Sequence, residues 1–390
     1  MLSDKRRNPV LASLSLLTVA ALYGLPFLQI APNRLVSGQP IYFLAVAQGM
    51  GSLPLMLLLL TPSIACFFKP TRVWLGASLL TASLAIPSLL WLAASQASFS
   101  LQSESPIARA ALGSAFWVVL VLLGFTASTA LQLLRASALQ VVLVSAALLL
   151  AVGLLLASGV CGDLSLMKEY ANRADSFGQV ITRHAQIVLL ALACTLAVGL
   201  PLGWAAHTQA KISRALLPVL NIIQTIPSVA LFGLLMAPLA LLAASVPALG
   251  RAGISGVGLA PAVIALTLYG LLPVVRGTLA GLQQVPSAMV QAARALGLTQ
   301  FQILFHVELP LAVPVLLGGV RTAAVSSVGL AAVTALIGAG GLGSVLFEGL
   351  FANAQDLVLL GVLPIIALGV VVDALFKVLM NLARRRVKPW

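Results

Sequence analysis

The stretch LQVVLVSAALLLAVGLLLASGV, residues Leu139–Val160, contains no charged side chain. An α-helix needs roughly 20 apolar residues to cross about 30 Å of hydrocarbon, and this stretch supplies them. Similar stretches recur along the 390 residues, of which 61% are hydrophobic and only 8% charged, whereas soluble domains carry roughly 25% charged residues. Gly and Pro lie inside these stretches and alternating ten-residue segments are absent, so the sequence predicts an all-α, polytopic membrane protein.

About ten transmembrane helices are predicted on this basis. The predicted spans are Val10–Ile30, Tyr42–Phe68, Val73–Ala94, Ala110–Leu134, Leu139–Val160, His184–Ala206, Leu216–Ala243, Leu259–Val275, Leu311–Ile337 and Leu357–Met380. An even number of spans places the basic clusters Lys5–Arg7 and Arg384–Lys388 on the same side, where most other Lys and Arg residues also fall. The positive-inside rule then puts both termini in the cytoplasm and explains the net charge of +13 without nucleic-acid binding.

The first span follows the cluster Lys5–Arg7, as a cleaved signal peptide would. We favour a retained membrane anchor, because the apolar stretch is longer than a signal core and no clear A-x-A site follows it. The three cysteines, Cys66, Cys161 and Cys194, are unevenly spaced in spans or at their ends. We interpret them as small apolar residues and not as a disulfide framework or a metal site.

The polar connection CGDLSLMKEYANRADSFGQVITR, residues 161–183, separates two halves of different character. Residues 1–160 form a predicted five-helix membrane region that carries little for chemistry. Residues 184–383 form a second five-helix region, where the distinctive segments gather, and residues 384–390 form a basic cytoplasmic tail. The connection itself is expected outside, as a solvated linker or as a contact for an external partner.

The longest cytoplasmic connection, residues 276–310, has the composition of two short helices joined by a glycine. Pro286 suits a first helical turn, and Gly297 can adopt the left-handed conformation that ends a helix. Thr299 and Gln302 form a T-x-x-Q capping box for a second short helix, which is expected to end before the next span. Such a loop could lie on the membrane surface or insert into a cleft of another protein, and the composition leaves both open.

The segment QAARALGLTQFQILFHVELP, Gln291–Pro310, resembles the EAA loop of ATP-binding-cassette (ABC) importer permeases. That loop reads E-A-A, three residues, Gly, about nine residues, an apolar residue, Leu and Pro. In the family it is the coupling helix, which sits in a groove of the ATPase subunit. The residues that the resemblance assigns to ATPase coupling are Gln291, Ala292, Ala293, Gly297, Glu308, Leu309 and Pro310. Because Gln291 stands where the family has an acid, a salt bridge attributed to that acid is not carried over.

Four further segments resemble the osmoprotectant branch of these permeases, which carries glycine betaine, carnitine and choline. They are NIIQTIPSVALFGLL (Asn221–Leu235), LYGLLPVVRGTLAGL (Leu268–Leu282), ELPLAVPVLLGGVRTAAV (Glu308–Val325) and ALIGAGGLGSVLFEGL (Ala335–Leu350). This resemblance covers the chain from about residue 180 to its end and implies a type I importer (MetI-like) permease core. The N-terminal half is similar to that of the longer YehY-type permease in the segments NPVLA, APNRLVSG (Ala31–Gly38) and DLSLMKEYANR (Asp163–Arg173).

The resemblance implies a transport subunit of a bacterial inner membrane and no enzyme. Its expected partners are an ABC ATPase, a second permease that is a copy or a relative, and a periplasmic or external substrate-binding protein. The chain lacks the P-loop pattern G-x-x-x-x-G-K-[ST], so ATP and Mg belong to the partner ATPase, and no cofactor is expected here. The expected mechanism is alternating access, in which closure of the ATPase dimer moves the coupling loop and opens the pathway outward.

Two ionisable residues lie deep in the last two predicted spans. At about 1.5 Å per residue, Arg321 lies roughly 16 Å and Asp373 roughly 12 Å from the cytoplasmic ends of their helices. We expect the two to pair and to hold the core together, with a pathway-lining role as the alternative. Pro227 and Pro273 are expected to interrupt their spans, as broken helices do along a substrate path, although proline also occurs in ordinary membrane helices.

The segment GAGGLG contains the dinucleotide-binding spacing G-x-G-x-x-G at Gly338, Gly340 and Gly343. We reject nucleotide binding, because no strand and no βαβ unit are predicted around it. These three glycines and Gly341 are instead expected to form a tight turn and a close helix approach near the outer mouth of the pathway.

Two rival functions remain open from the sequence. An ion-coupled secondary transporter would need carboxylates in mid-membrane, where Asp373 is the one candidate, and an ABC permease could carry another small solute such as an amino acid. Quaternary ammonium ligands favour aromatic boxes, but the aromatic residues of the predicted core are scattered, so tight recognition is expected on the binding protein. These aromatic residues are Trp204, Phe232, Tyr269, Phe347 and Phe351.

Overall fold

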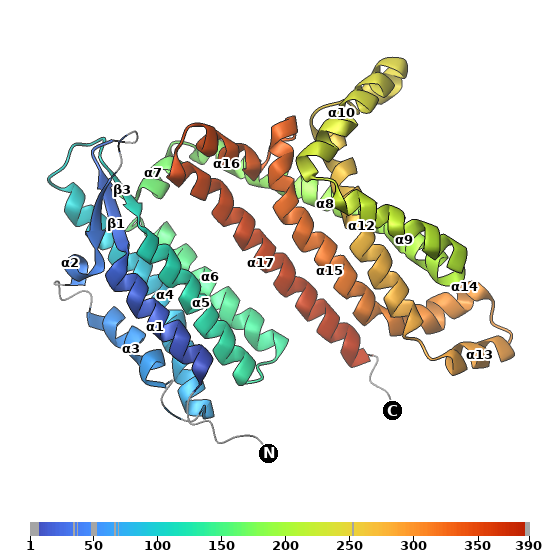
Figure 1. The fold of residues 1–390 in the computed structure, drawn as a ribbon, viewed down its shortest axis with the longest axis horizontal. Coiled ribbons are helices and arrows are strands. Elements are labelled where there is room, and N and C mark those ends of the chain that lie inside the picture. Colours follow the sequence, from blue (N-terminus) through green and yellow to red (C-terminus); the bar gives the residue numbers. More distant parts are fainter. Residues whose placement is uncertain are drawn as a thin grey trace. The chain divides into compact units, whose positions relative to one another are not determined.

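A computed structural model describes residues 8–33, 36, 38–47, 53–65, 68, 70–251 and 253–386 (Figure 1). The chain divides into two compact units, Met1–Asn172 and Arg173–Trp390. Cys66, the basic cluster Lys5–Arg7 and residues 387–390 of the basic tail lie outside the described residues.

The first unit is a bundle of helices with a small sheet at one end (Figure 1). Its helices are α1 (Pro9–Gly24), α2 (Phe43–Ala47), α3 (Leu53–Ala65), α4 (Arg72–Leu101), α5 (Ser114–Leu133), α6 (Ala138–Ala157) and α7 (Ser165–Ala171). Its strands are β1 (Pro26–Ala31), β2 (Gln39–Tyr42) and β3 (Arg109–Leu112), which form an antiparallel sheet in the order β2-β1-β3.

The sheet was not predicted, and it shortens the first predicted span, Val10–Ile30. Helix α1 ends at Gly24, and Leu25 adopts an extended conformation with φ −118° and ψ 153°. The cause is Pro26, because a residue that precedes proline is disfavoured in the helical region. The chain therefore continues as a strand, in which Leu28 lies opposite Leu112 of β3.

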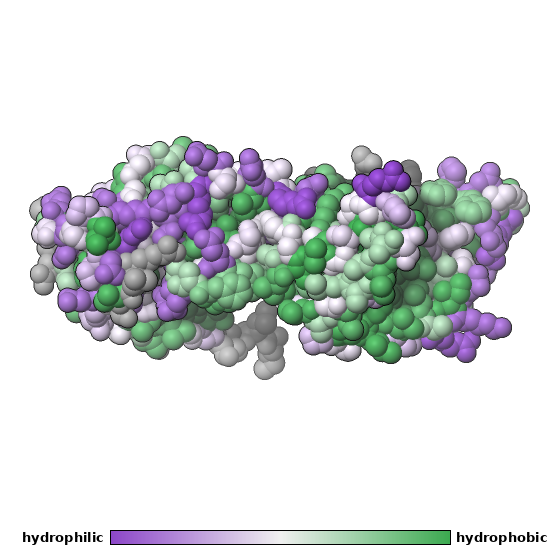
Figure 2. Space-filling model, turned by 90° about the horizontal axis from the view of Figure 1, so that it is seen from above, coloured by the Kyte–Doolittle hydropathy of each residue, from purple (hydrophilic) through white to green (hydrophobic). Residues whose placement is uncertain are grey.

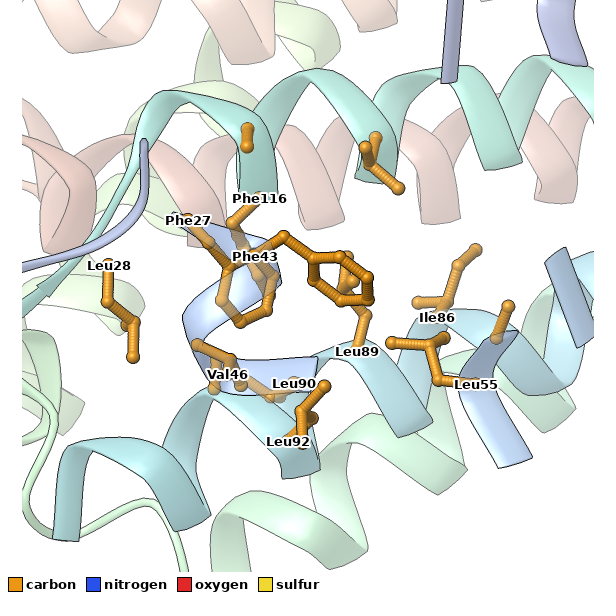
Figure 3. Packing of buried hydrophobic residues seen from close by; sticks show 14 of the residues in the cluster. Phe27, Leu28, Phe43, Val46, Leu55, Ile86, Leu89, Leu90, Leu92 and Phe116 are labelled. Carbon is orange, nitrogen blue, oxygen red and sulfur yellow. The ribbon is translucent and has the colours of Figure 1, made fainter. Parts of the chain in front are cut away.

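Aromatic rings fill the core of the first unit where the sheet meets the helices. The ring of Phe27 lies 5.6 Å from that of Phe43 and 6.3 Å from that of Phe116, measured between centroids. Figure 3 shows these rings against Leu89 of α4, all of them buried. Burying such a side chain contributes roughly 1.5–3 kcal/mol, so this cluster joins the sheet firmly to the bundle.

Eight helices of the described chain are long and apolar enough to cross a membrane, and they correspond to the third to tenth predicted spans. The first two predicted spans correspond to shorter apolar helices, α1 and α3. The second prediction, Tyr42–Phe68, begins with the end of β2 and with α2, and its residues 48–52 lie outside the described part. Hydrophobic residues cover broad areas of the surface in Figure 2, as expected for helices that face lipid.

The second unit begins with α8, which starts at Ala174 rather than at the predicted His184. Its helices are α8 (Ala174–Thr208), α9 (Ala210–Thr225), α10 (Ser228–Ser245), α11 (Pro247–Arg251), α12 (Leu259–Gln283), α13 (Ser287–Ala295), α14 (Gln300–Ile303), the π-helix η2 (Leu304–Glu308), α15 (Leu309–Val333), the 3-10 helix η3 (Thr334–Ile337), α16 (Leu342–Phe351) and α17 (Gln355–Arg386). Figure 1 shows α10 and α13 at opposite ends of α12, with α15 beside α17.

Helix α12 packs against both α8 and α15 at glycines. A Cβ atom added to Gly270 would lie 2.7 Å from the hydroxyl oxygen of Thr195 on α8. On the other side, a Cβ atom at Gly319 of α15 would lie 2.3 Å from the carbonyl oxygen of Pro273, and one at Gly277 would lie 2.8 Å from the Cα of Gly319. Small residues thus let three helix backbones approach closely, which is how helices associate in a membrane without a hydrophobic driving force.

Replacing Gly319 with alanine should separate α12 from α15, because the new methyl group meets a backbone carbonyl that cannot rotate away. We expect Gly319→Ala to destabilise the purified protein in detergent by roughly 1–3 kcal/mol, seen as a lower melting temperature. The control is Gly329→Ala on the same helix, where nothing lies within 4 Å of the added atom. An equal melting temperature for the two variants would show that the crossing is not tight.

Candidate functional site

A cavity of about 660 Å³ lies between α9, α12 and α15 of the second unit. Its wall combines apolar side chains with an amide, a phenol, a guanidinium and two hydroxyls. The lining residues are Gln224, Tyr269, Leu272, Pro273, Arg276, Gly277, Gly318, Gly319, Thr322, Ser326 and Leu330. A mostly apolar cavity with a few polar groups is the usual form of a small-molecule site.

Helical spacing accounts for which residues of α15 reach this cavity. Gly318, Thr322, Ser326 and Leu330 follow one another at intervals of four, so they lie along one face of the helix. The glycine crossing of α12 and α15 lies at the same place, because Gly277 and Gly319 also line the cavity.

Pro227 and Pro273 were both expected to interrupt their helices, but only one of them does. Helix α9 ends at Thr225 and α10 starts at Ser228, with Ile226 extended before Pro227, so the predicted span Leu216–Ala243 is broken there. At Pro273 the expected interruption is absent, because α12 runs without a break from Leu259 to Gln283.

A side chain from another helix compensates for Pro273. Proline has no N–H group, so the carbonyl of Tyr269, four residues earlier, lacks its helical hydrogen bond. The side-chain amide of Gln224 on α9 donates a hydrogen bond of 2.9 Å to that carbonyl. The hydroxyl of Tyr269 in turn donates to the carbonyl of Ile226. Two hydrogen bonds therefore join the broken end of α9 to α12 at the edge of the cavity.

Arg276 adds a positive charge to the cavity wall. Its Nη2 atom donates a hydrogen bond of 2.9 Å to Oδ1 of Asn221 on α9, and the side chain remains exposed in the single chain. Its partner in this bond is a neutral amide, so the charge of the guanidinium is not neutralised by it.

Arg321 and Asp373 lie together between α15 and α17. The Nε atom of Arg321 donates a hydrogen bond of 2.6 Å to Oδ1 of Asp373, and its Nη2 atom contacts the same oxygen. The second carboxylate oxygen accepts from Nζ of Lys377, one turn further along α17, at 2.8 Å. The side chains of Arg321 and Asp373 are 34% and 26% exposed. Both oxygens of the carboxylate are thus occupied by cations.

The loop that contains Gln291, Ala292 and Ala293 forms helix α13, which ends at a left-handed Gly297 with φ +81°. Thr299 and Gln302 form the predicted capping box at the start of α14. The second short helix is not separate, however. It continues through the π-helix η2, where Glu308 lies, into α15, so Leu309 and Pro310 stand in the first turn of α15.

Two contacts hold this loop against α8. The ring of Phe301 lies 5.4 Å from that of Trp204, and Nε2 of His207 lies 3.7 Å from a carboxylate oxygen of Glu308. Ala293 is buried, whereas Gln291 and Ala292 are exposed. Leu296 is 80% exposed, and Phe301 and Phe305 are also exposed. A loop predicted to lie outside the membrane thus presents apolar side chains, which is typical of a surface that binds a partner.

The glycine segment forms a turn between η3 and α16. Gly338, Gly340 and Gly341 have φ angles of 77°, 80° and 81°, which glycine adopts at no steric cost. A Cβ atom at Gly343 would lie 1.8 Å from the carbonyl oxygen of Ala332, so α16 approaches α15 closely.

Helix α8 contacts this turn from the other side. The Nε atom of Arg183 donates a hydrogen bond of 3.0 Å to the carbonyl of Ala339 within the turn. The side chain of His184 is buried and its Nε2 atom lies 3.1 Å from the carbonyl oxygen of Val328.

Trp204, Phe232, Tyr269, Phe347 and Phe351 do not converge on one place in the described structure. Phe232 is buried in a hydrophobic cluster, Trp204 contacts the loop, and Phe347 pairs with Phe351 at 6.1 Å. Tyr269 is the aromatic residue among those that line the cavity.

Comparison with known proteins accounts for both units. Residues 6–167 match the family described as ABC transporter permease YehY, N-terminal domain, and residues 196–387 match the binding-protein-dependent transport system inner membrane component family. The osmoprotectant import permease protein OsmW of Salmonella typhimurium is 37% identical over 202 residues, which are 52% of this chain and 89% of that protein. This chain belongs to the permease family of binding-protein-dependent ABC importers.

A further relative of this permease agrees with that assignment. The glycine betaine/carnitine/choline transport system permease protein OpuCD of Bacillus subtilis is 32% identical over 205 residues, which are 52% of this chain and 82% of that protein. A chain of the MetNI methionine ABC transporter in an inward-facing conformation is 22% identical, with a TM-score of 0.47 over 54% of this chain and 98% of that chain. The family match over residues 196–387 and the likeness to OsmW make the permease a multi-pass membrane subunit and not the ATPase of its transporter.

Sequence reasoning missed several residues that line the cavity of the permease. No sequence motif points to Gln224, Thr322 or Ser326, and Arg276 is the first residue of the predicted cytoplasmic connection, residues 276–310. Thr322 and Ser326, four residues apart on α15, were visible in the sequence as two hydroxyl groups on one face of a largely apolar helix. The role of Gln224 was not visible, because its acceptor lies 45 residues away on another helix.

Removing the carboxylate between α15 and α17 should destabilise the permease. Asp373→Asn leaves Arg321 and Lys377 without a counter-ion, so we expect a loss of roughly 1–3 kcal/mol, less than for a fully buried pair because both side chains are partly exposed. Melting of the purified protein in detergent measures this loss. Lys377→Gln keeps the Arg321–Asp373 pair and should cost less. Equal melting temperatures for the two variants would argue against a structural pair.

Proposed function

We propose that this permease forms the membrane path of an ABC importer for an osmoprotectant such as glycine betaine, carnitine or choline. The observation that carries this proposal is the likeness to OsmW, an osmoprotectant import permease, over 89% of the length of that protein. The cavity between α9, α12 and α15 supports it, because its volume of about 660 Å³ exceeds the size of a small solute and its wall is partly polar.

The path runs through this cavity, next to the break at Pro227. A broken helix exposes backbone groups that a passing solute can contact in mid-membrane. Gln224, Arg276, Thr322 and Ser326 are exposed in the single chain. A second permease, which is a copy of this chain or a relative of it, would cover this face and complete the path.

The loop of α13 and α14 docks into a groove of the ATPase. Exposed Ala292 offers a small, flat surface, and the neighbouring Leu296 supplies an apolar side chain for the groove. The contacts of Phe301 with Trp204 and of Glu308 with His207 attach the loop to α8. A movement of the loop is therefore passed to the helices of the core.

In this proposal both termini lie in the cytoplasm of a bacterial cell, and a binding protein delivers the solute to the opposite face of the inner membrane. Residues 184–383 form the permease core, and residues 1–160 form an additional membrane region, with residues 161–183 between them. The turn at Gly338, Gly340, Gly341 and Gly343 lies at the outer mouth of the path. ATP and Mg act on the partner ATPase.

An ion-coupled secondary transporter is the less favoured function. Its ion site would need Asp373, but both oxygens of that carboxylate already bind Arg321 and Lys377. A cation that entered this site would have to displace two fixed positive charges.

The proposal is tested with the permease, its ATPase and its binding protein reconstituted in liposomes, where uptake of glycine betaine should require ATP. Ala292→Glu places a charge on the exposed surface of α13, and burying that charge unpaired in the groove should cost about 2 kcal/mol or more. Uptake and recovery of the ATPase with the permease should then fall roughly tenfold or more.

The matched control for this test is Ala210→Glu, which places the same charge at the exposed first residue of α9. It should leave uptake and ATPase binding unchanged. Uptake that proceeds without any ATPase, or an Ala292→Glu variant with the behaviour of the control, would contradict the proposal.

A further inference from the structure

We infer that the cavity selects osmoprotectants that carry a carboxylate, such as glycine betaine and carnitine, over the bare cation choline, and that Arg276 is the residue that selects them. This inference rests on the proposed function and deepens it. It concerns a residue that has no assigned role in transport beyond its position in the cavity wall.

The charge on the cavity wall is of one sign, positive. Arg276 supplies a positive charge, and none of the residues that line the cavity is Asp or Glu. The carboxylate of Asp373 on α17 does not compensate, because it is held by Arg321 and Lys377 in a cluster that itself carries a net positive charge. A small cation without a carboxylate therefore finds no counter-ion here, whereas a carboxylate finds a guanidinium.

The guanidinium of Arg276 has the geometry to bind such a carboxylate. Its hydrogen bond to Asn221 uses Nη2, so one edge of the group is fixed by a neutral acceptor on α9. A guanidinium presents five N–H donors, which leaves donors for two parallel bonds to a carboxylate. Such charge-assisted bonds are roughly twice as strong as bonds between neutral groups.

Tyr269 offers the complementary contact for the other end of the solute. It stands seven residues before Arg276, two helical turns along the same face of α12, and its ring is held in place by the bond of its hydroxyl to Ile226. A quaternary ammonium group binds to the face of an aromatic ring through cation–π attraction. A solute with both an ammonium and a carboxylate therefore offers a suitable group to each of these residues, whereas choline leaves Arg276 without a carboxylate.

The test compares uptake of radiolabelled glycine betaine and choline by the complete transporter in liposomes, with the same binding protein saturated by each solute. For each permease, the uptake rate of betaine is divided by that of choline. The selectivity of the binding protein cancels when this ratio for a variant is divided by the ratio for the wild type. Arg276→Gln should lower this ratio roughly tenfold or more, as expected for the loss of a charge-assisted hydrogen bond. Arg276→Lys keeps the positive charge but loses the planar N–H donors that bind both carboxylate oxygens, so it should give an intermediate ratio.

Two controls separate selection from a structural role. Asn221→Ala removes the bond between α9 and Arg276 but keeps the guanidinium, so it should retain the preference of the wild type. Arg214→Gln makes the same substitution on α9 at an arginine that does not line the cavity, and it should change neither rate nor ratio.

The outcomes distinguish this inference from the proposed function. If Arg276→Gln slows both solutes equally or leaves the ratio unchanged, or if Asn221→Ala shifts the ratio as much as Arg276→Gln does, the selecting role of Arg276 is wrong while the proposed function stands. If the wild-type transporter carries neither solute in the presence of ATP, the proposed function itself fails.

Discussion

The close contact between α12 and its two neighbours is the constraint on which the second unit depends. Gly277 and Gly319 bring the backbones of α12 and α15 together, and Gly270 does the same for α12 and α8. Lipid provides no hydrophobic force that would push helices together, so this packing and a few polar contacts hold the bundle. The cavity exists beside the crossing because glycines leave space where larger side chains would fill it.

Helix α12 also connects the cavity with the loop at its end. Five of its residues line the cavity, the first being Tyr269 and the last Gly277, and the helix ends at Gln283, shortly before α13 begins at Ser287. Because α12 is continuous through Pro273, it can transmit a displacement of the loop to the cavity as a rigid element. The hydrogen bonds from Gln224 to Tyr269 and from Tyr269 to Ile226 extend that connection to α9.

The sequence predicted the features that depend on neighbouring residues. Apolar stretches of sufficient length indicated the long helices, and the pattern around Gly297 and Thr299 indicated the helix end and the capping box that the structure contains. Counting depth along two antiparallel helices was enough to suggest that Arg321 and Asp373 meet, since both distances follow from a constant helical rise.

Features that depend on distant partners could not be predicted in this way. An interior proline normally weakens a helix, but the donor that compensates for Pro273 comes from α9. Strand β1 looked like the end of an apolar span. Pro26 locally favours the end of the helix, but the formation of a sheet depends on pairing with β2 and β3. Arg276 was counted as a surface charge, because its position beside the cavity follows from how α9 packs on α12.

The central claim is that the cavity is a transport path whose access is switched by the ATPase. The most direct measurement is the labelling of Thr322→Cys, in a chain whose three native cysteines are replaced by serine, with a thiol reagent that cannot cross the membrane. The reagent should reach this position only from the cytoplasmic side without nucleotide, and only from the opposite side when the reconstituted transporter is trapped with ATP. Labelling that is the same in both states, or that occurs from neither side, would contradict the account.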